Sequence, residues 1–244
     1  MKQSPSTLAA AFLALCASAC GNSASPTTPT APSTPTAAAG EQPVQNPTIT
    51  NFSVSPTFGV SELTLITMSA AATDPNNLPL TYAWTYGNTT VNNSATTSAT
   101  FTGDGNVTAQ VTVVNSKGGT ATRSQSVTVG TMTGTWNLNV DRCGGSSNPA
   151  TLTLSQSGTS VTGTIYFPTQ WCNVTPRSGG TFKQPGTIDD KANVQMLRIA
   201  VTSGIVGSFL EVQLKGQLDS TGRKVIGVID QSGFRNDPMT MTKQ

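Results

Sequence analysis

The sequence contains no histidine, and only 10% of its residues are charged. Without histidine, the chain lacks the commonest general base, the commonest zinc ligand and any Ser-His-Asp triad. Its 13 Lys and Arg residues face 11 Asp and Glu residues, a formal net charge of +2. The basic residues form no cluster, and nucleic-acid binding needs a basic stripe, so we expect no nucleic-acid partner.

Long apolar runs and phosphate-binding loops are missing as well. No stretch approaches the roughly 20 apolar residues that a membrane-spanning helix needs. Neither a Walker-type loop nor a Gly-x-Gly-x-x-Gly motif occurs. The sequence therefore predicts no spanning helix and no cofactor.

The N-terminus has the parts of an export signal. A basic start at Lys2 precedes an apolar stretch over 8–15 that is too short to span a bilayer. The segment Ala17-Ser18-Ala19-Cys20 follows and resembles the lipobox of bacterial lipoproteins. That resemblance implies a signal peptide over 1–19 and acylation of Cys20, with palmitate among the chains. The alternative is an ordinary secretory signal cut near Ala19, with Cys20 left as a plain thiol.

The same resemblance implies a location. A chain lipidated at Cys20 is held on a membrane in the cell envelope, because each buried CH₂ contributes about 0.8 kcal/mol. Lipoproteins retained on the inner membrane commonly have Asp after the lipidated cysteine, where this chain has Gly21. We therefore expect an outer-membrane protein, exposed at the surface.

Residues 20–46 read as a lipid-anchored linker. Pro recurs among Ser and Thr from Ser25 to Thr36, a composition that cannot bury a core and favours extended backbone. We expect this segment to act as a spacer between the membrane and the folded part.

Residues 47–130 predict an immunoglobulin-like β-sandwich. Short alternating runs are separated by turns rich in Gly, Asn and Pro, as in sandwich domains. We expect Trp84 to fill the core of this domain. The segments Leu80-Thr81-Tyr82-Ala83-Trp84-Thr85-Tyr86-Gly87 and Val111-Thr112-Val113-Val114-Asn115-Ser116-Lys117-Gly118-Gly119 resemble the PKD family of exported bacterial proteins. That resemblance implies a spacer or a contact module rather than a catalyst.

Residues 131–244 predict a small antiparallel β-barrel of about eight strands, so the whole fold class is all-β. Closure into a barrel removes exposed sheet edges. Gly134-Thr135-Trp136 in the first strand is similar to the opening of lipocalin-like barrels. An open sandwich of six to eight strands is the alternative.

Cys143 and Cys172 are predicted to form a disulfide. Once Cys20 is lipidated, they remain as a pair in an oxidising compartment. A metal site is not expected, because the chain has neither His nor a Cys-x-x-Cys spacing.

The acidic residues give little sign of catalysis. A glycosidase needs two carboxylates across a sugar, and Asp141 with Asp230 or Glu211 would be the best candidates. We expect no enzyme activity. Turns are the expected role of the acidic residues Asp104, Asp219, Asp74 and the Asp189-Asp190 doublet. Calcium ligation is the alternative for Asp74 and for the doublet.

Tyr166 and Trp171 are the candidate binding residues. They lie in a short aromatic segment that the predicted disulfide would tether at Cys172, which suits recognition with little entropy to lose. The alternative is that Trp171 packs over the disulfide as part of the core.

The combined prediction is an anchored surface lipoprotein that binds a protein, a glycan or a small molecule without catalysis, through its C-terminal domain. One alternative is a carrier that encloses an apolar ligand beside Leu210, Val212 and Leu214. Another is an inhibitor of a hydrolase such as lysozyme or a protease, by analogy with small lipid-anchored barrels.

Overall fold

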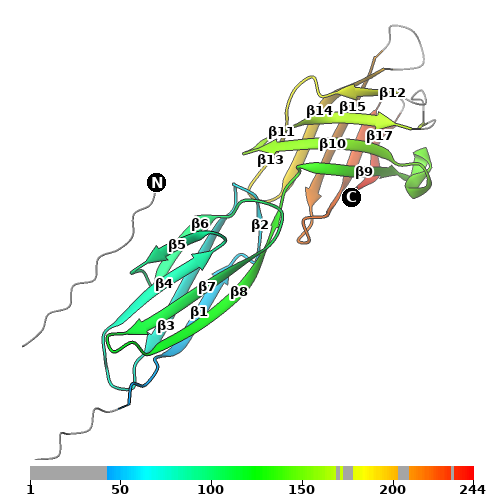
Figure 1. Cartoon of the computed structure of the whole chain (residues 1–244). Helices are drawn as coiled ribbons and strands as arrows, with labels where there is room; N and C mark the ends of the chain where they lie inside the picture. Colours follow the sequence, from blue (N-terminus) through cyan, green and yellow to red (C-terminus); the bar gives the residue numbers. More distant parts are fainter. Residues whose placement is uncertain (1–42, 169–170, 173–177, 203–208, 232–233) are drawn as a thin grey trace, which may run out of the picture. The chain divides into compact units, whose positions relative to one another are not determined.

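The computed structural model describes residues 43–168, 171–172, 178–202, 209–231 and 234–244 (Figure 1). The predicted signal peptide, Cys20 and most of the linker lie outside these residues. Pro43–Gln244 form one compact unit, and the fold is all-β, as predicted. Within the described part of the chain, no helix has the length and hydropathy needed to cross a membrane.

Two sheets form the first domain. One has the order β1-β3-β6, and the other has the order β2-β8-β7-β4-β5. All neighbours are antiparallel except β2 and β8, which are parallel. The strands are β1 (Thr48–Ser55), β2 (Phe58–Val60), β3 (Leu65–Thr73), β4 (Leu80–Tyr86), β5 (Thr89–Asn92), β6 (Thr96–Thr100), β7 (Gly105–Asn115) and β8 (Thr120–Gly130).

The alternating pattern of the sequence predicts which residues form the core of this sandwich. Along β7, Ala109, Val111 and Val113 are buried, whereas the residues between them are partly exposed. Trp84 is buried as predicted, and its ring stacks on Phe52 with centroids 5.9 Å apart. Period-two burial thus follows from apolar and polar residues that alternate on a pleated strand.

The buried Asn115 ties the start of the sandwich to its β7–β8 turn. Its amide donates to the carbonyl oxygen of Gln45 at 2.8 Å, and its side-chain oxygen accepts from Lys117 and Gly119 in the turn. Asn46 accepts from the backbone N–H of Thr120 at 3.0 Å. The folded part therefore includes Gln45 and Asn46, just before the boundary that the sequence predicts.

The second domain is a closed barrel. Its ring order is β10-β9-β17-β16-β15-β14-β13-β11, and β11 pairs back with β10, while β12 extends the pairing of β11. The strands are β9 (Gly134–Val140), β10 (Ala150–Ser157), β11 (Ser160–Phe167), β12 (Ser178–Thr181), β13 (Gly186–Ile188), β14 (Asn193–Thr202), β15 (Phe209–Leu218), β16 (Lys224–Gln231) and β17 (Phe234–Lys243). The short 3₁₀ helices η1 (Asp141–Cys143) and η2 (Gly145–Ser147) follow β9. Closure decides between the predicted barrel and the open sandwich, in favour of the barrel.

The described inward side chains of the barrel form one apolar cluster. Trp136, Phe167 and Trp171 are its largest members, and each is 0% exposed. Val212 and Leu214, two of the residues expected to line a carrier cavity, belong to the same packed cluster. The third, Leu210, lies outside the described side chains. Among the described residues the interior is therefore occupied by side chains, which leaves the carrier hypothesis without support.

Candidate functional site

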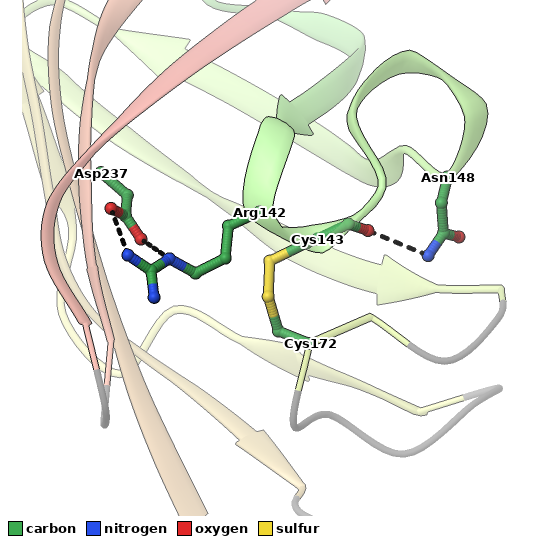
Figure 2. Close-up of a disulfide and its surroundings, with 5 residues drawn as sticks. All are labelled: Arg142, Cys143, Asn148, Cys172 and Asp237. Carbon is green, nitrogen blue, oxygen red and sulfur yellow. Dashed lines mark hydrogen bonds and ion pairs between the residues drawn. A yellow bond between two sulfur atoms is a disulfide. The ribbon is translucent and has the colours of Figure 1, made fainter.

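The predicted disulfide is present. Cys143 in η1 is bonded to Cys172, with their Cα atoms 4.7 Å apart (Figure 2). Nearby, Asn148 donates to the carbonyl oxygen of Cys143 at 3.2 Å, and Arg142 pairs with Asp237 at 2.7 Å. The bridge thus fastens the segment after β11 to a turn that has its own polar contacts.

The ring of Trp171 is not accessible to a binding partner. It is 0% exposed, and its ring centroid lies 4.9 Å from that of Phe167 in the barrel core. Its indole N–H has no hydrogen-bond partner among the described residues. The expectation that Trp171 forms a binding surface is therefore wrong. The disulfide at the next residue holds the ring inward, as the core-packing alternative expects.

Tyr166, in contrast, is 47% exposed on the outer face of the barrel. It lies on β11 directly opposite Thr151 of β10 and Gly179 of β12. A Cβ atom at residue 179 would lie 2.5 Å from the carbonyl oxygen of Ile165, so the position beside Tyr166 has no room for a side chain. Thr164, two residues before Tyr166, is exposed on the same face.

Two of the acidic turns have the predicted form. Asp189 accepts hydrogen bonds from the backbone N–H groups of Lys191 and Asn193 and from the side chain of Asn193, at 2.8–2.9 Å. The Asn193 side chain is the main cause that lowers the pKa of Asp189, against a smaller effect of desolvation. Asp219 caps the β15–β16 turn through the N–H groups of Thr221, Arg223 and Lys224.

The carboxylate of Asp74 also stabilises a turn. One oxygen accepts from the N–H groups of Asn76 and Leu78, and the other accepts from the Asn115 amide at 2.8 Å. Desolvation raises the pKa of Asp74, but the combined hydrogen bonds outweigh it, so the pKa lies below its ordinary value. Both carboxylate oxygens therefore accept hydrogen bonds from within the sandwich, as expected for a turn residue.

The three acidic residues that would have been the best candidates for catalysis are not brought to either described cavity. Asp230 accepts from the N–H of Asn236 at 2.6 Å, and Asp141 and Glu211 are exposed. None of the three lines the cavities described below. Within the described residues, no group of three or more Cys, Asp or Glu side chains is arranged to hold a metal ion.

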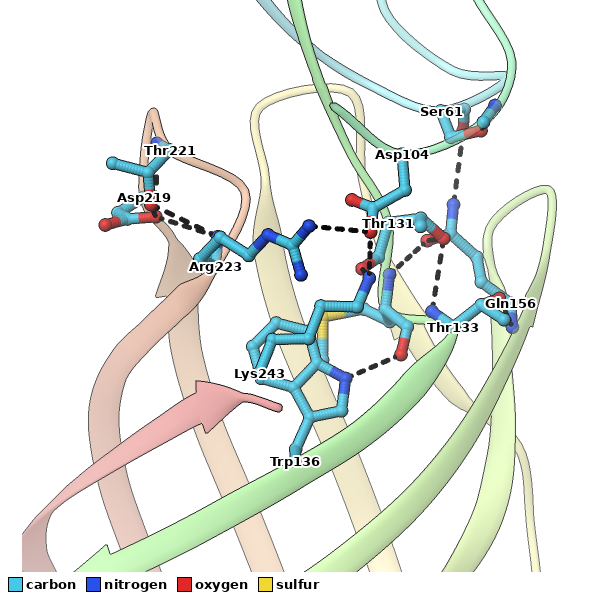
Figure 3. A network of polar contacts seen from close by, with 12 residues as sticks. Ser61, Asp104, Thr131, Thr133, Trp136, Gln156, Asp219, Thr221, Arg223 and Lys243 are labelled. Atoms are coloured by element: carbon cyan, nitrogen blue, oxygen red, sulfur yellow. Dashed lines mark hydrogen bonds and ion pairs between the residues drawn. The ribbon is translucent and has the colours of Figure 1, made fainter. Parts of the chain in front are cut away.

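Asp104 departs from the prediction. It was expected to bond its own turn, but its Oδ2 pairs with Nζ of Lys243 at 2.9 Å and lies 3.7 Å from Arg223 (Figure 3). The Lys243 side chain is only 6% exposed, and its Nζ also donates to the carbonyl oxygen of Thr131 and lies 5.5 Å from the Trp136 ring centroid. An acid from the sandwich is thus joined to the last strand of the barrel.

Gln156 on β10 makes the second polar connection between the domains. Its side-chain oxygen accepts from the N–H of Met132 at 2.8 Å and from the Thr131 hydroxyl at 3.1 Å. Its amide donates to the carbonyl oxygens of Ser61 at 3.2 Å and Gly158 at 3.1 Å. One side chain therefore holds the interdomain segment and the sandwich against the barrel.

Apolar contacts complete this junction. Val60 of β2 and Met132 of the connecting segment are buried within the core cluster of the barrel. The indole N–H of Trp136 donates to the carbonyl oxygen of Met132 at 2.9 Å. Gly130 and Gly222 approach closely, since a Cβ atom at Gly130 would lie 3.0 Å from the Cα atom of Gly222. The sandwich thus contributes part of the hydrophobic core of the barrel.

A polar cavity of about 310 Å³ lies at this junction. Its lining residues are Ser61, Glu62, Gly103, Asp104, Thr131, Thr133 and Gln156. Two carboxylates line it, but each is already engaged, Asp104 by Lys243 and Glu62 by the N–H of Gly158 at 2.9 Å. The Ser61 and Thr133 hydroxyls accept from the N–H groups of Gly103 and Gln156. The polar groups of this cavity therefore act mainly to join the domains.

A second cavity, of about 390 Å³, lies in the sandwich. Its lining residues are Tyr86, Gly87, Asn88, Thr89, Thr100, Phe101, Thr102 and Val107. The Tyr86 ring stacks on the buried Phe101, with centroids 5.2 Å apart and planes inclined by 18°. The period-two spacing of Tyr82, Trp84 and Tyr86 places them on one face of a strand. The sequence does not indicate that Tyr86, the last of the three, lines a cavity.

Comparisons with known proteins assign no family. No protein-family model matches the chain, and no curated protein matches it. One solved structure, concerned with carbohydrate-binding modules of the β-sandwich superfamily and their promiscuous specificity, is similar over 82% of this chain and 92% of its own. It shares 12% sequence identity with a TM-score of 0.34, a likeness too distant to indicate a ligand.

Proposed function

We propose that this chain is an exported lipoprotein of the cell envelope that binds a partner without catalysis, through the outer face of its barrel around Tyr166. The proposal joins the anchor indicated by the sequence to the surface described in the structure. The single observation that carries the binding site is the exposure of Tyr166.

Tyr166 has the surroundings of a contact residue. An aromatic ring that is 47% exposed gives a partner a large contact area at low entropic cost. Exposed threonines on β10, β11 and β12 share its face and provide hydroxyls for hydrogen bonds: Thr153, Thr162, Thr164 and Thr181. Its backbone belongs to a closed barrel, so little order is lost when a partner binds.

The polar groups support binding rather than catalysis. The chain has no histidine, and the two carboxylates that share a cavity, Glu62 and Asp104, bond groups across the junction. The inhibitor hypothesis needs an aromatic side chain that projects into a cleft, and Trp171 does not project. The exposed face around Tyr166 is the better candidate.

The anchor is tested by metabolic labelling. The full chain is expressed in a Gram-negative bacterium with a clickable palmitate analogue, beside Cys20→Ser and the matched control Cys16→Ser. Wild type and Cys16→Ser are expected to incorporate label and to fractionate with the outer membrane, whereas Cys20→Ser does neither. Label that persists in Cys20→Ser would show that Cys20 is not the anchor.

The binding face is tested with residues 21–244, applied to arrayed glycans and arrayed purified proteins. Tyr166→Ala is the test variant, and Ile226→Ala is the control, because Ile226 is a 56% exposed residue of the same barrel. We expect Tyr166→Ala to weaken a wild-type signal about tenfold or more, since aromatic contacts are typical binding hot spots. Equal signals for the two variants would refute the assignment.

A further inference from the structure

The cavity beside Tyr86 differs from the junction cavity in its chemistry. All its lining residues are uncharged, and they combine two aromatic rings, a valine, an amide and several hydroxyls. Its volume of about 390 Å³ lies within the range of small-molecule sites, roughly 300–1,000 Å³. A ligand that suits it must be neutral, with both apolar and hydroxyl-bearing faces.

The polar side chains of this cavity make no side-chain hydrogen bond within the part of the protein that the structure describes. Among the described residues, no side-chain hydrogen bond involves Tyr86, Asn88, Thr89, Thr100 or Thr102. In the junction cavity the corresponding groups are engaged by other groups of the protein. Donors and acceptors that line a cavity without internal partners can exchange their water for a ligand at little structural cost.

The elements around the cavity hold its aromatic face in place. Tyr86 ends β4, where it pairs with Thr89 across the β4–β5 turn and with Ala109 of β7. Phe101 is 4% exposed, its ring stacks on Tyr86, and its carbonyl oxygen accepts from the N–H of Glu62 at 2.9 Å. The Tyr86 ring is therefore positioned before any ligand arrives, and less entropy is lost on binding.

From these observations we infer that the sandwich domain carries a saccharide site at Tyr86, which takes one or two neutral pyranose units. A pyranose ring has an apolar C–H face that packs on an aromatic ring and a rim of hydroxyls that bond amides and threonines. The residues Asn88, Thr89 and Thr102 line the cavity and bring an amide and two hydroxyls that can bond that rim. This site is separate from the barrel face around Tyr166 and does not depend on it.

Solution NMR of ¹⁵N-labelled residues 21–244 tests the inference. N,N′-diacetylchitobiose, cellobiose and maltose are titrated one by one, and glucuronic acid serves as the charged comparator. We expect at least one neutral disaccharide to shift the amide signals of Gly87, Asn88 and Thr102, with a Kd of about 1 mM. Glucuronic acid is expected to leave these signals unchanged.

Variants separate this site from the barrel face. Tyr86→Ala and Asn88→Ala should each weaken binding about tenfold, whereas Tyr166→Ala should leave it unchanged. Tyr86→Phe keeps the stack on Phe101 and should lose only the hydroxyl contribution, so it tests the site even if Tyr86→Ala does not fold. No shift with any of the three disaccharides, shifts that map elsewhere, or equal weakening by Tyr166→Ala would each overturn the inference.

Discussion

Replacement of Gln156 by alanine is expected to separate the unfolding of the two domains. This side chain links three backbone segments through the N–H of Met132 and the carbonyl oxygens of Ser61 and Gly158. In Gln156→Ala, the N–H of the buried residue Met132 and the carbonyl of the buried residue Ser61 each lose a partner. The junction then keeps its apolar contacts and its other polar pairs, among them Asp104–Lys243, Glu62–Gly158 and Thr64–Asp190.

The magnitude follows from the four hydrogen bonds. Each one contributes a net stabilisation of about 0.5–1.5 kcal/mol, and a buried group left without a partner costs about 1–3 kcal/mol. The Gly158 carbonyl belongs to a partly exposed residue and can bond water instead, and the Thr131 hydroxyl still accepts from the N–H of Thr133. We therefore expect Gln156→Ala to lower the free energy of unfolding by about 2–4 kcal/mol.

The variant Gln156→Glu tests the two hydrogen bonds that the Gln156 amide donates. Its carboxylate still accepts from Met132 and Thr131, but it has no amide to donate to Ser61 and Gly158. The ionised form faces carbonyl oxygens, so the fold favours the protonated form and raises the pKa of the new carboxyl group. A raised pKa in the folded state means that the loss of stability is smallest at low pH and grows as the pH rises.

Urea titrations at constant temperature provide the assay. The three tryptophans report on both domains, because Trp84 lies in the sandwich core, whereas Trp136 and Trp171 lie in the barrel core. The wild type should unfold in one transition, and Gln156→Ala in two that are separated in urea concentration. Gln213→Ala is the control, a partly exposed glutamine of the same barrel. A single transition with the stability of Gln213→Ala would refute the assigned role of Gln156.

Three further predictions concern stability. Lys243→Met keeps the packing on Trp136 but removes the cation from Asp104, and should cost about 1–3 kcal/mol in urea denaturation at low salt. The double change Cys143→Ser with Cys172→Ser opens a loop between residues 29 apart and should cost about 3–4 kcal/mol on the chain-entropy model, measured against the wild type under oxidising conditions. Asp189→Asn removes a carboxylate whose pKa is lowered by the fold, so the stability it provides is present above pH 3.8 and is lost as the pH falls through the folded pKa. Urea midpoints of this variant and the wild type should therefore differ at pH 6 and converge in acid; a constant gap would contradict the assignment.

The strands and the disulfide follow from local signals. Alternation along β7 predicts which residues are buried, because a pleated strand turns successive side chains to opposite faces. The turn Ser157-Gly158-Thr159 lies between β10 and β11, as its composition indicates. Two cysteines left in an oxidising compartment predict the Cys143–Cys172 bond.

The sites that depend on distant residues could not be predicted in the same way. Asp104 looked like a turn residue, but its partner Lys243 is 139 residues away in the sequence. Trp171 lies in an aromatic segment that suits a binding surface as well as a core, and its inward position depends on the disulfide and on Phe167. The Tyr86 cavity needs the β4–β5 turn beside the segment that follows β6, an arrangement that only the packing of two sheets produces.

The shared core changes the role expected for the sandwich. A spacer needs no chemistry of its own and no particular contact with the domain that it carries. Here Val60 and Met132 complete the hydrophobic core of the barrel, and Gln156 and Lys243 satisfy backbone groups of the connecting segment. A barrel cut free at residue 131 would lose Val60 and expose the apolar surface that Val60 covers, so binding measured on the isolated barrel would report on an altered domain. Because the two domains share core residues and polar contacts, contacts through Tyr86 and Tyr166 with one polymeric partner would act together, and two weak contacts would give a much stronger attachment.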